Sequence, residues 1–295
     1  MERAQRIGIG SIAVSLAALA MKGAGWWLTG SAAIFSDAAE TFVNVAASTL
    51  TVFALSVAVR PADVNHPFGH AKAEFFAAAI EGGLIVGAAL VILHEAWETW
   101  LLGELPRLSW FGIGLTLLGA VLNGAWAAVL FRVGKRERSP ALVADGRHLF
   151  TDVMTSFGVV GGVLLGIGSG IVALDPLFAA LVAAYILVSG YRLIRASVGG
   201  LMDEAIDESL LARIRKVVSE QGIGAIEAHD LRTRSAGRDI FLEFHLVVPA
   251  KMTVAEAHEI CDRIEAALRA AVPGLTTTIH IEPEGKAKHH GVIVL

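Results

Sequence analysis

Long apolar segments dominate the N-terminal part of the chain. A helix needs roughly 20 apolar residues to cross the hydrocarbon core of a bilayer. Six blocks reach that length: residues 7–28, 31–58, 73–100, 108–131, 141–167 and 171–193. The first block is too long for a cleaved signal peptide, and a second follows almost at once. The pattern predicts an α-helical membrane protein with six transmembrane helices in residues 1–203.

A different pattern begins near residue 207, where short amphipathic segments with frequent charges replace the long apolar blocks. The order is a helix, two strands joined by a turn at 235–238, a helix and a strand: residues 207–221, 225–234, 239–249, 253–272 and 276–283. Thr253 and Glu256 form a capping box that starts the second helix. We expect a small α+β domain of order αββαβ at 204–284, followed by a flexible tail at 285–295.

Composition and charge place the apolar part in a bilayer. Hydrophobic residues make up 55% of the chain and charged residues 18%, whereas soluble proteins carry about a quarter charged residues. Basic residues near the block ends gather on one side of the membrane, and the other side has only Arg107. The basic residues on the first side are Arg3, Arg6, Arg60, Lys72, Arg132, Lys135, Arg136, Arg138, Arg192 and Arg195. Since such residues mark cytoplasmic loops, both termini and the α+β domain should be cytoplasmic, in the inner (plasma) membrane.

Several classes of function are disfavoured. The only cysteine, Cys261, excludes a disulfide framework and a thiolate metal cluster within one chain. The sequence has no phosphate-binding loop, catalytic triad or basic nucleic-acid patch. We therefore expect neither an enzyme, nor an ATP-driven pump, nor a nucleic-acid-binding protein.

Two of the blocks share a polar motif. The stretch "DGRHLFTDVMTS" (145–156) aligns with "DAAETFVNVAAS" (37–48). Identical residues fall at Asp37 and Asp145, Phe42 and Phe150, Val45 and Val153, and Ser48 and Ser156. The match is either an internal repeat or chance. The two blocks cross in opposite directions, an arrangement by which transporters place a substrate site near the midplane.

The differing positions of the motif carry metal-binding atoms. Glu40 and Asn44 in one block, and His148 and Asp152 in the other, are each spaced i, i+4, so each pair lies on one helix face. At 1.5 Å per residue, both pairs reach the middle third of the membrane. Together they would form a tetrahedral shell for a divalent ion. The alternative is that these polar groups pair with one another inside the bundle.

With these motifs the chain resembles the cation diffusion facilitator family of metal/proton antiporters. The resemblance rests also on "RPADVNHPFGHAKAE" after the second block and on "HDLRTRSAG", "FLEFHL" and "TTTIHIEP" near the C-terminus. It implies a cytoplasmic ferredoxin-like domain, a homodimer and a transport site at Glu40, Asn44, His148 and Asp152. Here Glu40 is unusual and Asn44 replaces an aspartate. The lost charge should weaken the site, although an amide oxygen can still coordinate.

The loop after the second block offers Asp63, His66 and His70. By composition these residues form either a metal site or a solvated loop rich in turn formers. The resemblance implies a metal site at the cytoplasmic mouth. It also implies that Lys72 and Asp203 form a charge cluster that ties two subunits together, whereas the residues alone equally allow Lys72 to be a basic side chain snorkelling at a helix end.

Histidines also gather in the α+β domain. A single histidine on a strand is more often packed or solvated than bound to metal, but the resemblance implies regulatory metal sites here. Their ligands would be His229, His245, His258, His280 and Glu282. Glu282 follows His280 by two residues and therefore lies on the same face of its strand.

The expected function is efflux of a divalent transition metal in exchange for protons, with metal and protons competing for the same lone pairs. The oxygen and nitrogen ligands favour Zn(II), followed by Fe(II), Mn(II), Co(II), Ni(II) and Cd(II). The alternatives are a metal-sensing or partner subunit with a weakened site, and an efflux transporter for Fe(II) or Mn(II).

Lys22 and Glu81 also interrupt the blocks. We expect each to lie alone or near a helix end, where pairing with another group or snorkelling is sufficient. Asp145 should be reached by cytoplasmic water.

Overall fold

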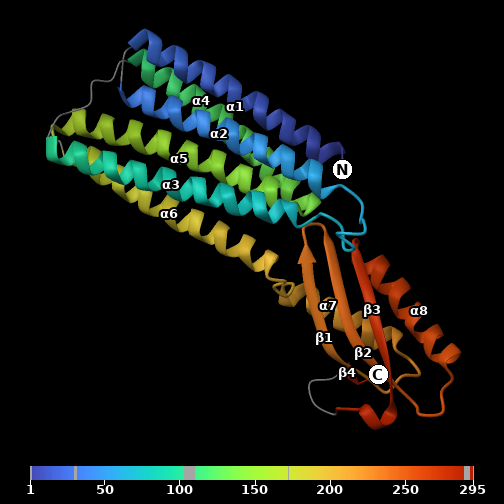
Figure 1. Ribbon diagram of the computed structural model, residues 1–295. Coiled ribbons are helices and arrows are strands. Elements are labelled where there is room, and N and C mark those ends of the chain that lie inside the picture. Colours follow the sequence, from blue (N-terminus) through green and yellow to red (C-terminus); the bar gives the residue numbers. More distant parts are fainter. Residues whose placement is uncertain (1, 30–31, 103–109, 172, 289–292, 295) are drawn as a thin grey trace. The chain divides into compact units, whose positions relative to one another are not determined.

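The structure is a computed structural model that describes residues 2–29, 32–102, 110–171, 173–288 and 293–294 (Figure 1). The chain divides into two compact units, Met1–Val198 and Gly199–Leu295. The first unit is entirely helical in its described residues, and the second combines helices with a sheet. Each unit has its own buried core.

Six long helices form the first unit within the described residues: α1 (Glu2–Thr29), α2 (Ala32–Ala58), α3 (Ala73–Leu102), α4 (Trp110–Glu137), α5 (Pro140–Ser169) and α6 (Leu174–Leu201). At 1.5 Å per residue each is about 40 to 45 Å long, which is enough to cross a bilayer. Within the described part of the chain, α1, α3, α4 and α6 contain spans that are long and apolar enough to do so by composition alone. The helical membrane domain expected from the sequence is confirmed. Helices α2 and α5 carry the polar motifs.

The helices of the first unit pack as a bundle with one close glycine crossing. Helices α1, α2, α4 and α5 contact one another, and α3 contacts α2 and α5. Helix α6 meets α3 at Gly82 and Gly190, where a Cβ atom on Gly190 would lie 3.1 Å from the carbonyl oxygen of Gly82. Small residues allow helices to approach this closely in membranes. Ile85, Ala144 and Ile186 join α3, α5 and α6 in one buried cluster.

The second unit has the predicted order αββαβ. Its main elements are α7 (Glu208–Gln221), β1 (Glu227–Ala236), β2 (Asp239–Val248), α8 (Val254–Ala271) and β3 (Leu275–Pro283). Strand β2 pairs antiparallel with β1 and parallel with β3. The predicted capping box of Thr253 and Glu256 is present at the start of α8.

The core of the second unit fixes which side chains reach the other face of the sheet. Leu242, Phe244 and Leu246 of β2 pack in one buried cluster with Ile214 of α7 and Ile264 of α8. Because successive strand residues point to opposite faces, the residues between them, including the histidine of β2, point away from the helices.

The chain continues beyond β3 along the sheet. A short 3₁₀ helix, η1 (Glu284–Lys286), follows β3, and β4 (Ile293–Val294) pairs antiparallel with β1. The sheet order is therefore β3-β2-β1-β4. Between these elements the Lys288 amide donates a 2.6 Å hydrogen bond to Glu227 Oε1, and its ammonium group bonds Asp230 Oδ2 at 2.5 Å. Residues 289–292 and 295 of the tail lie outside the described residues.

Candidate metal sites

Helices α2 and α5 bring their polar motifs to one level of the bundle. The two helices pack together and run in opposite directions (Figure 1). Ser48 on α2 donates a 2.9 Å hydrogen bond to Asp145 Oδ1 on α5, which sets their register. One turn back along α2 and one turn forward along α5, this register brings Asn44 level with His148, and Asp152 follows His148 by about one further turn. Three of the four predicted ligands therefore lie within about one helical turn of one another along the bundle. Glu40 belongs to α2, but its side chain lies outside the described residues.

Two of these ligands have no polar partner among the described residues. Asn44 is 0% exposed and His148 is 4% exposed. Neither the amide oxygen and nitrogen of Asn44 nor the two ring nitrogens of His148 form a hydrogen bond within the described part of the chain. Buried polar atoms in folded proteins are nearly always hydrogen-bonded. The unpartnered atoms of Asn44 and His148 therefore indicate a place where a ligand could bind.

Asp152, the third predicted ligand, is already paired. Lys22 on α1 places its Nζ atom 3.2 Å from both Asp152 carboxylate oxygens, and the Asn123 side chain on α4 donates a 2.7 Å hydrogen bond to Oδ2. The Lys22 and Asp152 side chains are 0% and 1% exposed. Of the two roles that the sequence allowed for Lys22, the side chain pairs with an acidic group and does not snorkel. This pair lies within the candidate site.

Sequence reasoning missed both Lys22 and Asn123 as members of the site. Lys22 lies seven residues before the end of α1, or about 10 Å along its axis. A lone lysine at that depth needs a buried partner of opposite charge. The signal was present, but the partner lies on another helix and no local spacing identifies it.

A second polar cluster lies next to the candidate metal site, and it corrects the expectation that water reaches Asp145. Asp145 is fully buried and accepts hydrogen bonds from Ser11 at 2.5 Å and from Ser48 at 2.9 Å. Glu81 on α3 is also fully buried, and Thr51 on α2 donates a hydrogen bond to its Oε1. Neither acidic residue lies at a wet helix end, and Glu81 is not isolated. Together these bonds tie α1, α2, α3 and α5 together.

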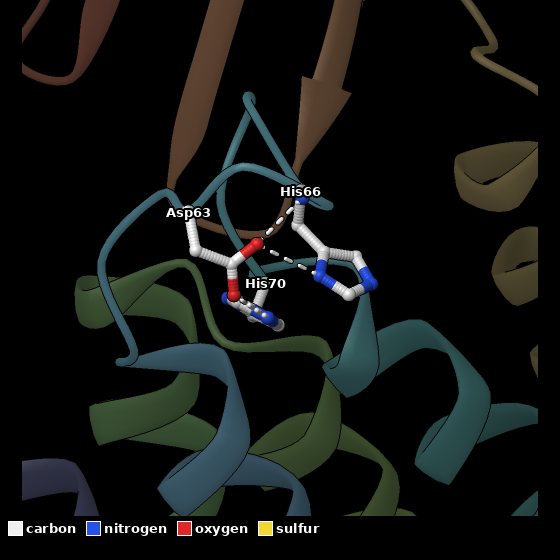
Figure 2. Close-up of side chains that lie close together, drawn as sticks. All are labelled: Asp63, His66 and His70. Carbon is white, nitrogen blue, oxygen red and sulfur yellow. Dashed lines mark hydrogen bonds and ion pairs between the residues drawn. The ribbon is translucent and has the colours of Figure 1, made fainter.

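The loop between α2 and α3 gathers the predicted carboxylate and two imidazoles (Figure 2). Asp63 lies between the two rings: Oδ1 is 3.2 Å from His66 Nδ1, and Oδ2 is 3.5 Å from His70 Nε2. One ligand atom from each of the three lies within 4.8 Å of the others. The His70 Nδ1 atom is buried and makes no hydrogen bond in the described part of the chain. A divalent ion could bind here with little rearrangement.

A turn in the loop holds Asp63 in place. Its Oδ1 atom accepts backbone hydrogen bonds from Asn65 at 2.9 Å and from His66 at 2.7 Å, as in an Asx turn. The bond from the His66 backbone is the main reason why the pKa of Asp63 lies below its ordinary value. The carboxylate is therefore kept in the charged form that a metal requires. Gly69 adopts a φ of 81°, which lets the chain turn towards His70.

Across the sheet of the second unit, three histidines form a row. The backbone register pairs His229 with His245 and His245 with His280. Their rings follow at centroid distances of 5.3 Å and 4.9 Å. Glu282 lies between them, with one oxygen 3.3 Å from His229 Nε2 and the other 3.4 Å from His245 Nδ1. Asp230 was not among the ligands predicted from the sequence, but its carboxylate lies within 4.8 Å of ligand atoms of His229 and His245.

Two predicted site assignments are not brought together within one unit. His258 lies on α8, where it is 70% exposed and pairs with Asp262 at 3.8 Å. Since α8 packs on the opposite face of the sheet from the histidine row, His258 is not part of that cluster. Asp203 lies in the second unit and forms a 3.4 Å ion pair with Arg234, while Lys72 lies in the first. The Lys72 and Asp203 cluster stays a prediction.

Comparisons with known proteins identify the family of the chain. The family model described as the cation efflux transmembrane domain matches residues 9–202, and that of the cation efflux protein cytoplasmic domain matches residues 206–284. A transporter of unassigned activity from Synechocystis sp. is 40% identical over 273 residues, covering 92% of this chain and 88% of the relative.

Further relatives include the cation-efflux pump FieF of Pectobacterium atrosepticum, which is 33% identical over 93% of this chain and 91% of its own length. A solved structure of a candidate zinc transporter, CzrB, in its Zn form is 52% identical over 29% of this chain and 98% of its own chain, with a TM-score of 0.28. The matching models and relatives are cation efflux transporters and not enzymes. The chain therefore belongs to the cation diffusion facilitator family of cation efflux transporters.

Proposed function

We propose that this chain exports a divalent transition metal, with Zn(II) as the first candidate, through a site formed by Glu40, Asn44, His148 and Asp152. One observation carries the proposal. Asn44 and His148 are buried within about one helical turn of Asp152, and none of their polar side-chain atoms has a hydrogen-bond partner in the described part of the chain. A metal ion would satisfy the Asn44 oxygen and one His148 nitrogen at once, whereas an empty site leaves them desolvated.

The ligand types narrow the choice of ion. An imidazole nitrogen with carboxylate and amide oxygens suits Zn(II), Fe(II), Mn(II), Co(II), Ni(II) and Cd(II), and the lack of a thiolate disfavours Cu(I). Export in exchange for protons follows from the same ligands, because a proton and a metal compete for the same lone pair. Protons that reach the site from outside would promote release of the metal.

The other features fit a homodimer in the inner membrane with both termini in the cytoplasm. The basic residues of the loops support this orientation. The Asp63, His66 and His70 site would collect metal at the cytoplasmic mouth, and the His229, His245, His280 and Glu282 row would bind metal as a regulatory ligand. Lys72 and Asp203 would join the subunits.

Transport in proteoliposomes tests the proposal. The purified chain would be reconstituted with a zinc-sensitive dye and a pH-sensitive dye inside the vesicles, and each ion would be tried in turn. Asp152→Asn should abolish the metal flux and the proton flux together. The control is Asp262→Asn, which changes an exposed acidic residue of α8 and should leave both fluxes intact. Full metal flux in Asp152→Asn would exclude the proposed site.

Asn44 supports a second candidate function, in which the chain senses metal or serves as a partner subunit. The position is fully buried and carries no charge, so the site binds a cation less strongly than one with a further carboxylate. Asn44→Asp distinguishes the two. In a transporter it should raise an existing activity or affinity modestly, and in a sensor it should create flux where the natural chain has none.

A further inference from the structure

The ammonium group of Lys22 occupies the position that a metal ion would need on Asp152. Its Nζ atom lies 3.2 Å from both oxygens of the carboxylate. The Asn123 amide takes a further lone pair of Oδ2 at 2.7 Å. The Asp152 carboxylate is therefore already neutralised and hydrogen-bonded by the protein, whereas the polar side-chain atoms of Asn44 and His148, about one helical turn away, have no hydrogen-bond partner among the described residues.

We infer that Lys22 is a tethered counter-cation that holds the Asp152 carboxylate when the site is empty and that an incoming metal ion must displace. The inference rests on the proposed function, because it assumes that Asp152 is a metal ligand. It makes Lys22 a positioning residue that sets how tightly the site binds and how readily it releases its ion.

Charge is the first argument for displacement. A divalent ion bound to Asp152 would lie within a few ångströms of the ammonium group in a fully buried layer, where screening by water is weak. The two cations repel each other and compete for the same two oxygens. The metal therefore binds fully only when the ammonium group moves off the carboxylate. Conversely, Lys22 restores a neutral pair when the metal leaves, so the empty site does not carry a bare buried charge.

The second argument is the space that α4 leaves for the Lys22 side chain. Gly119 faces the Lys22 stem: a Cβ atom there would lie 3.3 Å from Lys22 Cε and 3.7 Å from Cγ. Asn123 follows Gly119 by one turn on the same face of α4. One face of α4 thus leaves room for the lysine stem and binds its partner carboxylate. The flexible four-carbon stem gives the ammonium group freedom to move away.

The inference predicts a specific change in transport kinetics. In Lys22→Met the stem is kept and the competing charge is removed, so zinc should bind more tightly and leave more slowly. We expect KM for zinc uptake into proteoliposomes to fall by about tenfold or more, and kcat to fall with it. Lys22→Arg keeps the charge, and its KM should stay close to that of the natural chain. A purely structural lysine would lower kcat or folded yield without lowering KM.

A second variant, Gly119→Ala, tests the same inference if Lys22→Met does not fold. The added methyl group crowds Lys22 Cε and weakens its hold on Asp152, so KM should fall by roughly two- to threefold. Gly124→Ala is the matched control on the same helix, because its Cβ would make only an ordinary 3.6 Å contact with Val153. An unchanged or higher KM in the folded Lys22 or Gly119 variant would overturn the inference.

The Asp152→Asn variant in the same assay separates this inference from the proposed function. If Asp152→Asn still transports zinc, the proposed site is wrong and the role of Lys22 falls with it. If Asp152→Asn is silent and Lys22→Met does not lower KM, the metal site stands and only the counter-cation role is lost.

Discussion

Ser48 on α2 and Asp145 on α5 form a 2.9 Å hydrogen bond between two oppositely directed helices, one turn away from the candidate metal ligands. Asp145 also accepts a 2.5 Å bond from Ser11 on α1, so one carboxylate ties three helices together. Since all three residues are fully buried, each bond forms away from competing water. The register of α2 against α5, and with it the alignment of Asn44 with His148, depends on this contact.

Removing one donor of this cluster should destabilise the membrane domain. In Ser48→Ala, Asp145 keeps only the Ser11 bond, and we expect a loss of about 1 to 3 kcal/mol in unfolding free energy. Thermal unfolding of the purified protein in detergent measures it. The control is Thr49→Ala on the same helix, because the exposed Thr49 hydroxyl bonds only the Val45 carbonyl among the contacts described. Equal melting temperatures for the two variants would contradict a clamping role for Ser48.

The crossing of α3 and α6 provides a matched glycine pair. A Cβ atom at Gly82 would lie 2.7 Å from Ile194 Cγ1 and 3.2 Å from the Gly190 carbonyl oxygen, whereas one at Gly83 would meet nothing within 4 Å. Gly82→Ala should therefore cost about 1 to 3 kcal/mol through overpacking. Gly83→Ala should be neutral or slightly stabilising, since alanine favours the helix. Thermal unfolding compares them, and equal losses at the two positions would argue against a close crossing.

The Asp63 turn should respond to pH in a defined direction. The folded-state pKa of Asp63 lies below its ordinary value, because the His66 and Asn65 backbone groups donate to the carboxylate. Its stabilising contribution is therefore complete above the unfolded pKa of about 3.9 and is lost as the pH falls through the lower folded pKa.

Amide hydrogen exchange at Asn65 and His66 measures this contribution. We expect protection relative to an unstructured peptide to persist at pH 5 and to disappear only below about pH 4. The Gly69 amide, which bonds the His66 carbonyl at 2.9 Å, provides an internal comparison that does not use the carboxylate. In Asp63→Asn this acid-dependent loss should vanish. Loss of protection already between pH 7 and 5 would be the opposite result.

We expect substitutions in the histidine row and at His258 to have different effects on the amount of bound metal. Glu282 lies within reach of both His229 and His245, so Glu282→Ala should reduce the zinc bound by the full chain at equilibrium dialysis. His258→Ala should leave the bound zinc unchanged, because His258 is exposed and pairs with Asp262 on α8. A loss of zinc in His258→Ala with none in Glu282→Ala would mean that the row is not the binding site.

Local patterns predicted most of the fold and some of the groups that the candidate site residues form in the structure. The apolar blocks predicted the helices of the membrane domain, and alternation with turn residues predicted the order αββαβ. The i, i+4 spacing of His148 and Asp152 placed them on one face of α5, and Asp63, His66 and His70 come together because eight residues of loop contain all three. These features depend on spacing along one element, which is readable from sequence.

The missed features depend on contacts between distant segments. Lys22 pairs with a residue 130 positions away, and Asp145 is buried by hydroxyl groups from two other helices. No periodicity within α1 or α5 indicates these partners. His258 was grouped with the other histidines by resemblance, but α8 packs its apolar side on the sheet and leaves His258 in solvent.

The strand β4 extends the second unit beyond the end of the matching family model. The family model of that domain stops at residue 284, yet Lys288 bonds Glu227 and Asp230, and Ile293 and Val294 pair with β1. A fragment cut at residue 284 would expose the edge of β1 at Glu227 and Ala228 and lose the Lys288 contacts, and exposed edges recruit other strands. Fragments prepared for biophysical work should therefore extend through Val294, because shorter ones would tend to associate through an edge that the full chain covers.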